Sequence, residues 1–279
     1  MKLTEMRQIL SAGRVQLTKA LGQNFLHDGN QVRRMLAAAE LRASDRVLEI
    51  GPGLGPLTEL LAEQVSHVTA IETDRRLIQI LAERFATTRN LTLIHADALA
   101  YLRTDPTDWS SWKLVANLPY SVASPLLVEL ARTDRGPERM VFTVQLEVAR
   151  RLAATADDAD YGQLSLLVQL RYLSRGWFRI PATCFFPVPR IDSACLTLTR
   201  REPPLLGPDV TTTFTRVVKR AFAQRRKMLV KLLKEEWPVA TLSAALDRLQ
   251  LRSGVRAEQV TLEQFVQLAQ LLHPVAAPP

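Results

Sequence analysis

The feature that most constrains the fold is an alternation of two hydrophobic periodicities between residues 46 and 117. Short runs of aliphatic and β-branched residues are separated by stretches whose apolar residues are spaced three and four apart. The short runs lie at 46–50, 67–72, 91–97 and 113–116. Strands that alternate with helices in this way favour βαβ units and a parallel sheet. We therefore predict an α/β fold.

A segment rich in proline divides the chain. Residues 201–210 contain three prolines and one glycine, which is typical of a linker. The sequence beyond it shows only helical spacing of apolar residues. We predict one domain over residues 1–200, with a basic N-terminal arm, and a small helical domain over residues 201–279.

The composition excludes several classes of protein. The longest apolar runs are far shorter than the roughly 20 residues that cross a bilayer, and the N-terminus lacks a secretory signal, so we expect neither a membrane span nor secretion. The two cysteines, Cys184 and Cys195, suit a reducing cytoplasm. With only 4 histidines and no His/Cys cluster, we expect no metal site.

The net charge of +8 is concentrated in two parts of the chain. Residues 1–36 hold six basic and two acidic side chains, and residues 200–236 hold ten basic and four acidic, whereas residues 37–199 are nearly neutral. No acidic residue lies between Asp209 and Glu235. This stripe is either a solvated helix face or a surface for a polyanion, and nucleic acid is the first partner to test. The RNA-binding residues that we predict are Arg225, Arg226 and Lys227.

A glycine-rich loop follows the first predicted strand. Residues 51–56 read Gly-Pro-Gly-Leu-Gly-Pro and lead into a helical pattern. Glycine lets the backbone approach a ligand closely, and doubly wound sheets bind nucleotides at such a loop. Gly51 and Gly53 are therefore candidate cofactor contacts, although a plain strand-to-helix turn can have the same composition.

Acidic residues end the next two predicted strands. Glu72 can accept hydrogen bonds from both hydroxyls of a ribose, and Asp97 can accept from an adenine amino group or cap a helix. The loop departs from the dinucleotide pattern, because Pro56 has no N–H to offer a pyrophosphate. A nucleoside without phosphates fits better. The cofactor that we predict is S-adenosylmethionine, whose cationic sulfonium carries a transferable methyl group.

The fourth predicted strand ends in the tetrapeptide Asn117-Leu118-Pro119-Tyr120. The Asn117 amide oxygen and the Leu118 carbonyl, next to a proline-held backbone, can accept the two hydrogens of one planar amino group. Tyr120 offers a flat face on which a base can stack. These four residues predict methylation of an exocyclic amine, although a plain turn with a packed tyrosine has the same sequence.

Five motifs make the chain resemble the ribosomal RNA adenine N6,N6-dimethyltransferases, in the branch that acts on the small subunit. The motifs are LGQNFL (21–26), EIGPGLG (49–55), NLPY (117–120), CFFPVPRIDS (184–193) and FAQRRK (222–227). The resemblance implies a Rossmann-like class I methyltransferase sheet of seven strands and a small helical domain that binds RNA or the ribosome. It implies dimethylation of two adjacent adenosines near the 3′ end of small-subunit (16S) ribosomal RNA by a monomer that acts on the immature 30S subunit.

The resemblance also assigns roles to three residues that the spacing alone does not. It implies that Asn24 and Leu26 lie over the methionine end of the cofactor. It further implies that Phe186 forms an aromatic wall of the target-base site, opposite Tyr120. It agrees with the roles inferred above for the glycine loop, the two strand-end acids and Asn117.

Three alternatives stay open. A large-subunit (23S) adenine dimethyltransferase of the antibiotic-resistance type shares every motif of the cofactor domain, although Leu118 and the basic run favour the small-subunit branch. A mainly non-catalytic assembly factor would use only the basic surfaces, and a nicotinamide oxidoreductase is a distant third.

Leu146 and Gln163 stand where the family often has a lysine and an arginine, which removes two potential phosphate contacts.

Overall fold

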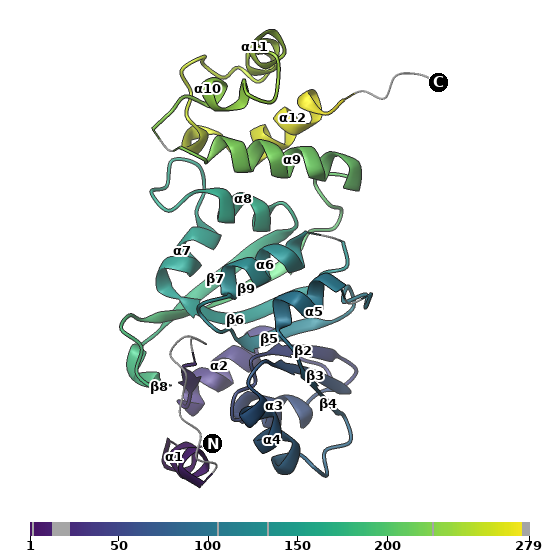
Figure 1. Cartoon of the computed structure of the whole chain (residues 1–279), viewed down its shortest axis with the longest axis vertical. Coiled ribbons are helices and arrows are strands. Elements are labelled where there is room, and N and C mark those ends of the chain that lie inside the picture. Colours follow the sequence, from purple (N-terminus) through teal and green to yellow (C-terminus); the bar gives the residue numbers. More distant parts are fainter. Residues whose placement is uncertain (2, 13–22, 105, 133, 225, 275–279) are drawn as a thin grey trace. The chain divides into compact units, whose positions relative to one another are not determined.

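The computed structural model describes residues 1, 3–12, 23–104, 106–132, 134–224 and 226–274 (Figure 1). The chain divides into two compact units. The first unit consists of Met1–Ala149 and Leu173–Arg200, and the second of Arg150–Tyr172 and Arg201–Pro279.

A seven-stranded sheet forms the centre of the first unit, in the order β4-β3-β2-β5-β6-β9-β7. Its strands are β2 (Arg46–Ile50), β3 (His67–Glu72), β4 (Leu91–His95), β5 (Lys113–Asn117), β6 (Arg139–Gln145), β7 (Tyr172–Ile180) and β9 (Ser193–Arg200). The five strands from β4 to β6 run parallel, and β9 is antiparallel to β6. The α/β fold and the four predicted strands are confirmed, with differences of one or two residues at the ends of β4 and β5.

Helices connect the parallel strands of this sheet. They are α3 (Pro56–Ala62), α4 (Arg75–Arg84), α5 (Ala98–Thr104) and α6 (Ala123–Ala131). Helix α2 (Gly29–Ala39) precedes β2, and α7 (Leu146–Ala153) follows β6. Strands β2 and β5 are buried almost throughout, as expected for parallel strands that helices cover on both faces. The helix α2 packs on this core through Val32, Met35 and Ala39.

A second, two-stranded sheet joins parts of the chain that lie far apart in sequence. Strand β1 (Phe25–Leu26) pairs antiparallel with β8 (Phe185–Phe186), so that Phe25 faces Phe186 and Leu26 faces Phe185. The helix α1 (Leu3–Ala12) packs beside it, with Met6 and Leu10 in one apolar cluster with Phe25. The motifs 21–26 and 184–193 therefore meet in the folded chain.

The second unit is helical. It contains α8 (Gln163–Gln169), α9 (Pro208–Ala221), α10 (Leu229–Leu233), α11 (Val239–Arg248) and α12 (Leu262–Leu272). Helix α9 packs against α8, α10 and α12. Helix α12 begins with a capping box, in which the Thr261 hydroxyl accepts a hydrogen bond from the Gln264 N–H and the Gln264 side chain accepts one from the Thr261 N–H.

The boundary between the two units is not a single cut at residue 200. Residues 150–172 belong with the helical unit, because the Tyr161 ring packs edge-on against Phe222 and its hydroxyl donates to the Val260 carbonyl at 3.0 Å. The predicted linker is also shorter, since α9 begins at Pro208, a residue whose fixed φ suits the first turn of a helix.

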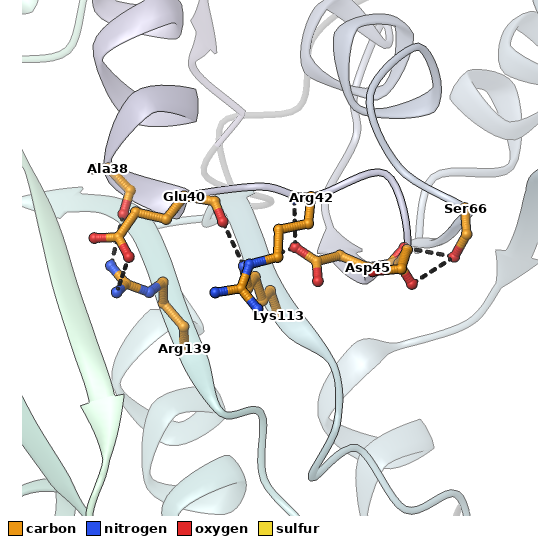
Figure 2. A network of polar contacts seen from close by, with 8 residues as sticks. Ala38, Glu40, Arg42, Asp45, Ser66, Lys113 and Arg139 are labelled. Carbon is orange, nitrogen blue, oxygen red and sulfur yellow. Dashed lines mark hydrogen bonds and ion pairs between the residues drawn. The ribbon is translucent and has the colours of Figure 1, made fainter.

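An ion-pair network lies at the amino ends of β5 and β6 (Figure 2). The Lys113 ammonium donates to the Glu40 carbonyl at 2.6 Å and to an Asp45 carboxylate oxygen at 2.7 Å. Arg139 donates to the Ala38 carbonyl at 3.0 Å and to the Glu40 carboxylate at 2.6 Å. The network ties the end of α2 to the edge of the sheet opposite the strand ends that carry the predicted site.

Replacement of Lys113 with methionine is expected to lower the free energy of unfolding by roughly 3 kcal/mol, because it leaves the Asp45 carboxylate poorly paired in a site where the Lys113 side chain is only 7% exposed. Urea denaturation measures this change. Arg132→Met is the control, since Arg132 is 61% exposed in its pair with Glu129 and should cost less than about 1 kcal/mol. Equal effects of the two variants would contradict the prediction.

No helix in the described part of the chain is both long and apolar enough to cross a membrane.

Candidate cofactor and target-base site

A pocket opens where β2, β3, β4 and β5 end at their carboxyl termini. Its empty volume is about 790 Å³, counting the part open to solvent. The predicted site residues that line it are Asn24, Gly51, Gly53, Glu72, Asp97, Asn117, Leu118 and Pro119. The structure thus brings together residues from five separate segments at the edge where open α/β sheets bind ligands.

The glycine loop adopts backbone angles that favour glycine. Gly51 and Gly53 have φ angles of +71° and +62°. A Cβ atom on Gly53 would lie 2.5 Å from the Phe25 ring, and one on Gly51 would lie 3.1 Å from the Pro119 ring. Glycine is required at both positions, because a side chain would displace either the segment over the pocket or the tetrapeptide 117–120.

Glu72 is fixed by the backbone around it. One carboxylate oxygen accepts from the N–H groups of Thr73 and Asp74 at 2.9 and 3.0 Å, and the other accepts from Gly53 at 3.2 Å. Burial raises the pKa of Glu72, and these three hydrogen bonds oppose the rise. The side chain is held rigidly at the pocket wall, as a ligand for ribose hydroxyls requires.

Asp97 caps a helix and also faces the pocket. A side-chain oxygen accepts from the Ala100 N–H at 2.8 Å, which caps α5, and the residue lines the pocket as well. The lining contains the acids Glu72 and Asp97 but, among the described residues, neither lysine nor arginine. An acidic pocket without basic side chains suits a cationic nucleoside and disfavours a pyrophosphate, so its residues fit S-adenosylmethionine.

Asn117 is anchored through both atoms of its amide. Its Nδ2 donates to the Asn24 carbonyl at 2.7 Å, and the Thr143 hydroxyl donates to its Oδ1. Thr143, which is fully buried on β6, therefore fixes which side of the amide carries the oxygen. Because a carbonyl oxygen has two lone pairs, Oδ1 can still accept a hydrogen from a target amino group.

Tyr120 is held from two sides. Its hydroxyl hydrogen-bonds the Ser193 hydroxyl, and its ring packs edge-on against Phe185 with the centroids 6.4 Å apart. Burial raises the pKa of Tyr120 to about 12, so the phenol stays neutral near pH 7. The ring is an oriented aromatic surface beside the end of β5.

Phe186 packs against α1. Its ring packs in the cluster with α1, and the Arg7 guanidinium lies 5.2 Å from the ring centroid. The aromatic ring in contact with Tyr120 is that of Phe185, which is 1% exposed. Spacing could not distinguish the two phenylalanines, because the choice depends on the pairing of β8 with β1. The role of Phe186 as a wall for the base stays a prediction.

Leu26 is also placed differently from its neighbour Asn24. It is 4% exposed in the apolar core, and it borders a smaller cavity that shares Phe25, Gly51 and Asn117 with the main pocket. Its contact with the cofactor stays a prediction. Gln23, which belongs to the motif 21–26 but is assigned no role from the sequence, lines the main pocket and donates to Asp74 at 3.1 Å.

The predicted RNA-binding residues lie between α9 and α10. Arg226 and Lys227 are exposed, whereas Arg225 lies outside the described residues. No group of three or more His, Cys, Asp or Glu that could hold a metal occurs in the part of the chain that the structure describes.

Glu49, beside the glycine loop on β2, has a raised pKa. Burial raises its pKa from 4.5 to about 8, although the Thr58 hydroxyl donates to it at 2.7 Å. Since the folded pKa lies above that of the unfolded chain, the contribution to stability is fully present below about pH 4.5 and is lost as the pH rises toward 8. Glu49 therefore makes the wild-type protein less stable as the pH rises from about 4.5 to 8.

Glu49→Gln should remove this dependence. We expect the variant to gain stability relative to the wild type, by a few kcal/mol, between pH 5 and pH 8. Urea denaturation at several pH values measures the difference. A difference that stays constant across this interval would contradict the assigned pKa.

Comparison with known protein families supports the same chemistry. Residues 14–273 match the family model described as ribosomal RNA adenine dimethylase. Two similar proteins, both named ribosomal RNA small subunit methyltransferase A, come from Natranaerobius thermophilus and Magnetococcus marinus. The first is 37% identical and covers 96% of each chain, and the second is 40% identical and covers 93% of each chain.

Solved structures show the same fold. The 23S rRNA methyltransferase ErmE is 30% identical, with a TM-score of 0.67 over 89% of this chain and 99% of its own. A dimethyladenosine transferase from Plasmodium falciparum, 24% identical, has a TM-score of 0.73 over 88% of this chain and 95% of its own. The match to the family model and these identities, together with the geometry above, show that the chain belongs to the ribosomal RNA adenine dimethylase family.

Proposed function

We propose that this protein uses S-adenosylmethionine to dimethylate the N6 amino groups of two adjacent adenosines near the 3′ end of small-subunit ribosomal RNA, as a monomer in the cytoplasm during subunit maturation. The observation that carries the proposal is the anchored Asn117 amide at the mouth of an acidic nucleoside pocket. The names of the relatives, at 37% and 40% identity over nearly the whole chain, support the small subunit as the target.

In this mechanism the chain binds and orients more than it transfers protons. When bound, S-adenosylmethionine supplies a methyl group on a cationic sulfur. Glu72 holds the ribose and Asp97 the adenine. Asn117 Oδ1 and the Leu118 carbonyl accept the two N6 hydrogens of the target adenosine, which directs the nitrogen lone pair toward the methyl group.

The target base must leave its stack to reach this position. We place it against Tyr120, whose neutral ring is fixed by Ser193 and Phe185. No side chain needs to act as a general base, because the N6 proton becomes acidic only once the nitrogen carries the new methyl group. Primer extension on ribosomal RNA from cells that lack the gene tests the proposal, with loss of the small-subunit dimethyladenosines as the expected result.

The same experiment distinguishes the large-subunit alternative, which the similarity to ErmE keeps in view. Loss of a large-subunit modification, with the small-subunit sites intact, would replace our proposal by that one. A non-catalytic assembly role is tested by expressing Asn117→Ala in the deletion strain, where full rescue of subunit maturation would favour binding alone. Titration of the purified protein with S-adenosylmethionine and with NAD tests the oxidoreductase alternative.

The basic segment after α9 is proposed to contact RNA phosphates. Charge reversal at Arg225, Arg226 and Lys227 should weaken binding to immature subunits and flatten its salt dependence, by about one unit of slope per lost contact, without changing affinity for S-adenosylmethionine. Arg248→Glu with Arg252→Glu is the control, since both arginines are exposed in a segment with balanced charge. An unchanged salt slope in the first variant would remove this segment from the interface.

A further inference from the structure

Three of the four large hydrophobic residues exposed among the described residues lie within positions 177–191 of the first unit. Trp177 is 43% exposed on β7, and Val188 and Ile191 are 62% and 44% exposed in the loop between β8 and β9. Strand β7 is the last strand of the sheet, so one of its edges is not covered by another strand of that sheet. Large apolar residues exposed beside a functional site commonly mark an interaction surface.

The geometry of β7 explains why Trp177 points away from the core. Phe178 and Ile180 pack on the apolar cluster that contains α2. Because successive residues of a strand face opposite sides, Trp177 and Arg179 share the other face. Gly176, with a φ of +108°, marks an irregularity in the strand just before Trp177.

The surface continues from Trp177 to the loop. Arg179 donates to the Asp192 carboxylate at 2.6 Å, and Asp192 also accepts from the Ala182 N–H at 2.8 Å. Asp192 stands between the exposed Ile191 and Ser193, whose hydroxyl bonds that of Tyr120. These hydrogen bonds link the edge strand that carries Trp177 to the loop that ends at Ser193, beside the proposed target-base site.

The segment that carries this surface is basic, and its one acidic neighbour, Asp192, pairs with Arg179. No acidic residue occurs between Asp160 and Asp192, whereas Arg175, Arg179 and Arg190 all lie in this interval and are exposed. Aromatic and apolar side chains between arginines match the composition of platforms that bind single-stranded nucleic acid.

We propose that Trp177, Arg179, Val188, Arg190 and Ile191 form a platform for the single-stranded RNA that flanks the target adenosine. This inference rests on the proposed function. An adenosine that enters the pocket leaves its neighbours unstacked, and unstacked bases gain by stacking on an aromatic ring. Trp177 supplies that ring, and the arginines contact the phosphates on either side.

Trp177 makes a direct test possible. Trp109 and Trp112 are 6% and 7% exposed and Trp237 is half-buried, so Trp177 is the most exposed of the four tryptophans. A single-stranded oligoribonucleotide of roughly ten residues should therefore quench the fluorescence of Trp177. Trp177→Phe should lose most of the quenching and keep most of the affinity, which fluorescence anisotropy of a labelled oligonucleotide measures. Trp177→Ala should weaken binding about tenfold.

Two controls separate the platform from a general loss of structure. Trp177→Ala should leave S-adenosylmethionine affinity and the unfolding temperature unchanged, because the side chain lies outside the pocket and the core. Val239→Ala, which trims an exposed residue on α11, should leave affinity for the oligonucleotide unchanged.

The outcomes also distinguish this inference from the proposed function. Normal methylation with unchanged RNA affinity in Trp177→Ala would overturn the platform and leave the function standing. Quenching and a tenfold loss of affinity, without methylation of small-subunit RNA by the wild type, would overturn the function and support the platform. If the oligonucleotide leaves Trp177 emission unchanged while Trp177→Ala weakens binding to whole subunits, a protein neighbour occupies the surface and the inference is wrong.

Discussion

Replacement of Asn117 with alanine is expected to remove nearly all methyl transfer while binding of S-adenosylmethionine stays measurable. The variant loses the acceptor that positions the target amino group, and loss of one such oriented group costs about 100- to 1000-fold in kcat. The affinity for the cofactor should change less, because Glu72, Asp97 and the glycine loop remain. Single-turnover methylation of small-subunit RNA and calorimetric titration with the cofactor measure the two effects.

Two further variants show whether orientation or mere presence of the amide matters. Thr143→Val keeps Asn117 but removes the hydroxyl that anchors its oxygen, so kcat should fall by about tenfold with the KM for the cofactor unchanged. Asn90→Ala is the matched control, because Asn90 donates to the Ala62 and Val65 carbonyls outside the pocket. Asn90→Ala should cost stability alone, and retained turnover in Asn117→Ala would refute the assignment.

Gly53→Ala should have the second largest effect, a loss of cofactor affinity of roughly 100-fold. The new Cβ would lie 2.5 Å from the Phe25 ring, which is itself packed, and the φ of +62° is unfavourable for alanine. Relief of the clash must move Phe25 or the loop, and the loop carries the N–H that Gly53 donates to Glu72. Isothermal titration calorimetry measures the affinity.

Two other glycines separate the clash from the backbone strain. Gly176 has a φ of +108°, and a Cβ atom on it would meet no heavy atom within 4 Å, so Gly176→Ala should cost about 1 kcal/mol of stability and leave cofactor affinity unchanged. Gly207 has neither constraint, and Gly207→Ala should be nearly neutral. If Gly53→Ala behaves like Gly176→Ala, contact with Phe25 does not control the pocket.

The sequence predicts the centre of the fold well because the relevant signals are local. Each parallel strand is a short apolar run with a helical pattern after it, and the carboxyl ends of neighbouring parallel strands must meet at one edge. The glycine loop, Glu72, Asp97 and Asn117 therefore come together as predicted. Pro56 also begins α3, where its missing N–H is tolerated.

The parts that the sequence does not predict depend on contacts between distant segments. Strands β1 and β8 have two residues each, too few for a periodicity, so neither their pairing nor the placement of Phe186 against α1 could be inferred. The assignment of residues 150–172 to the helical unit depends likewise on Tyr161 and its partners, which come later in the chain. The anchoring of Asn117 by Thr143 follows from the register of β5 with β6.

The two-residue ladder between β1 and β8 has a thermodynamic consequence. It joins the segment that begins at Gln23, beside the cofactor pocket, to the segment that ends at Ser193, beside Tyr120. A ligand that orders one segment also changes the free energy of the other, and linkage requires the effect to be reciprocal. If bound cofactor raises the affinity for RNA by some factor, bound RNA must raise the affinity for the cofactor by the same factor. The order in which the two bind therefore cannot alter the stability of the ternary complex.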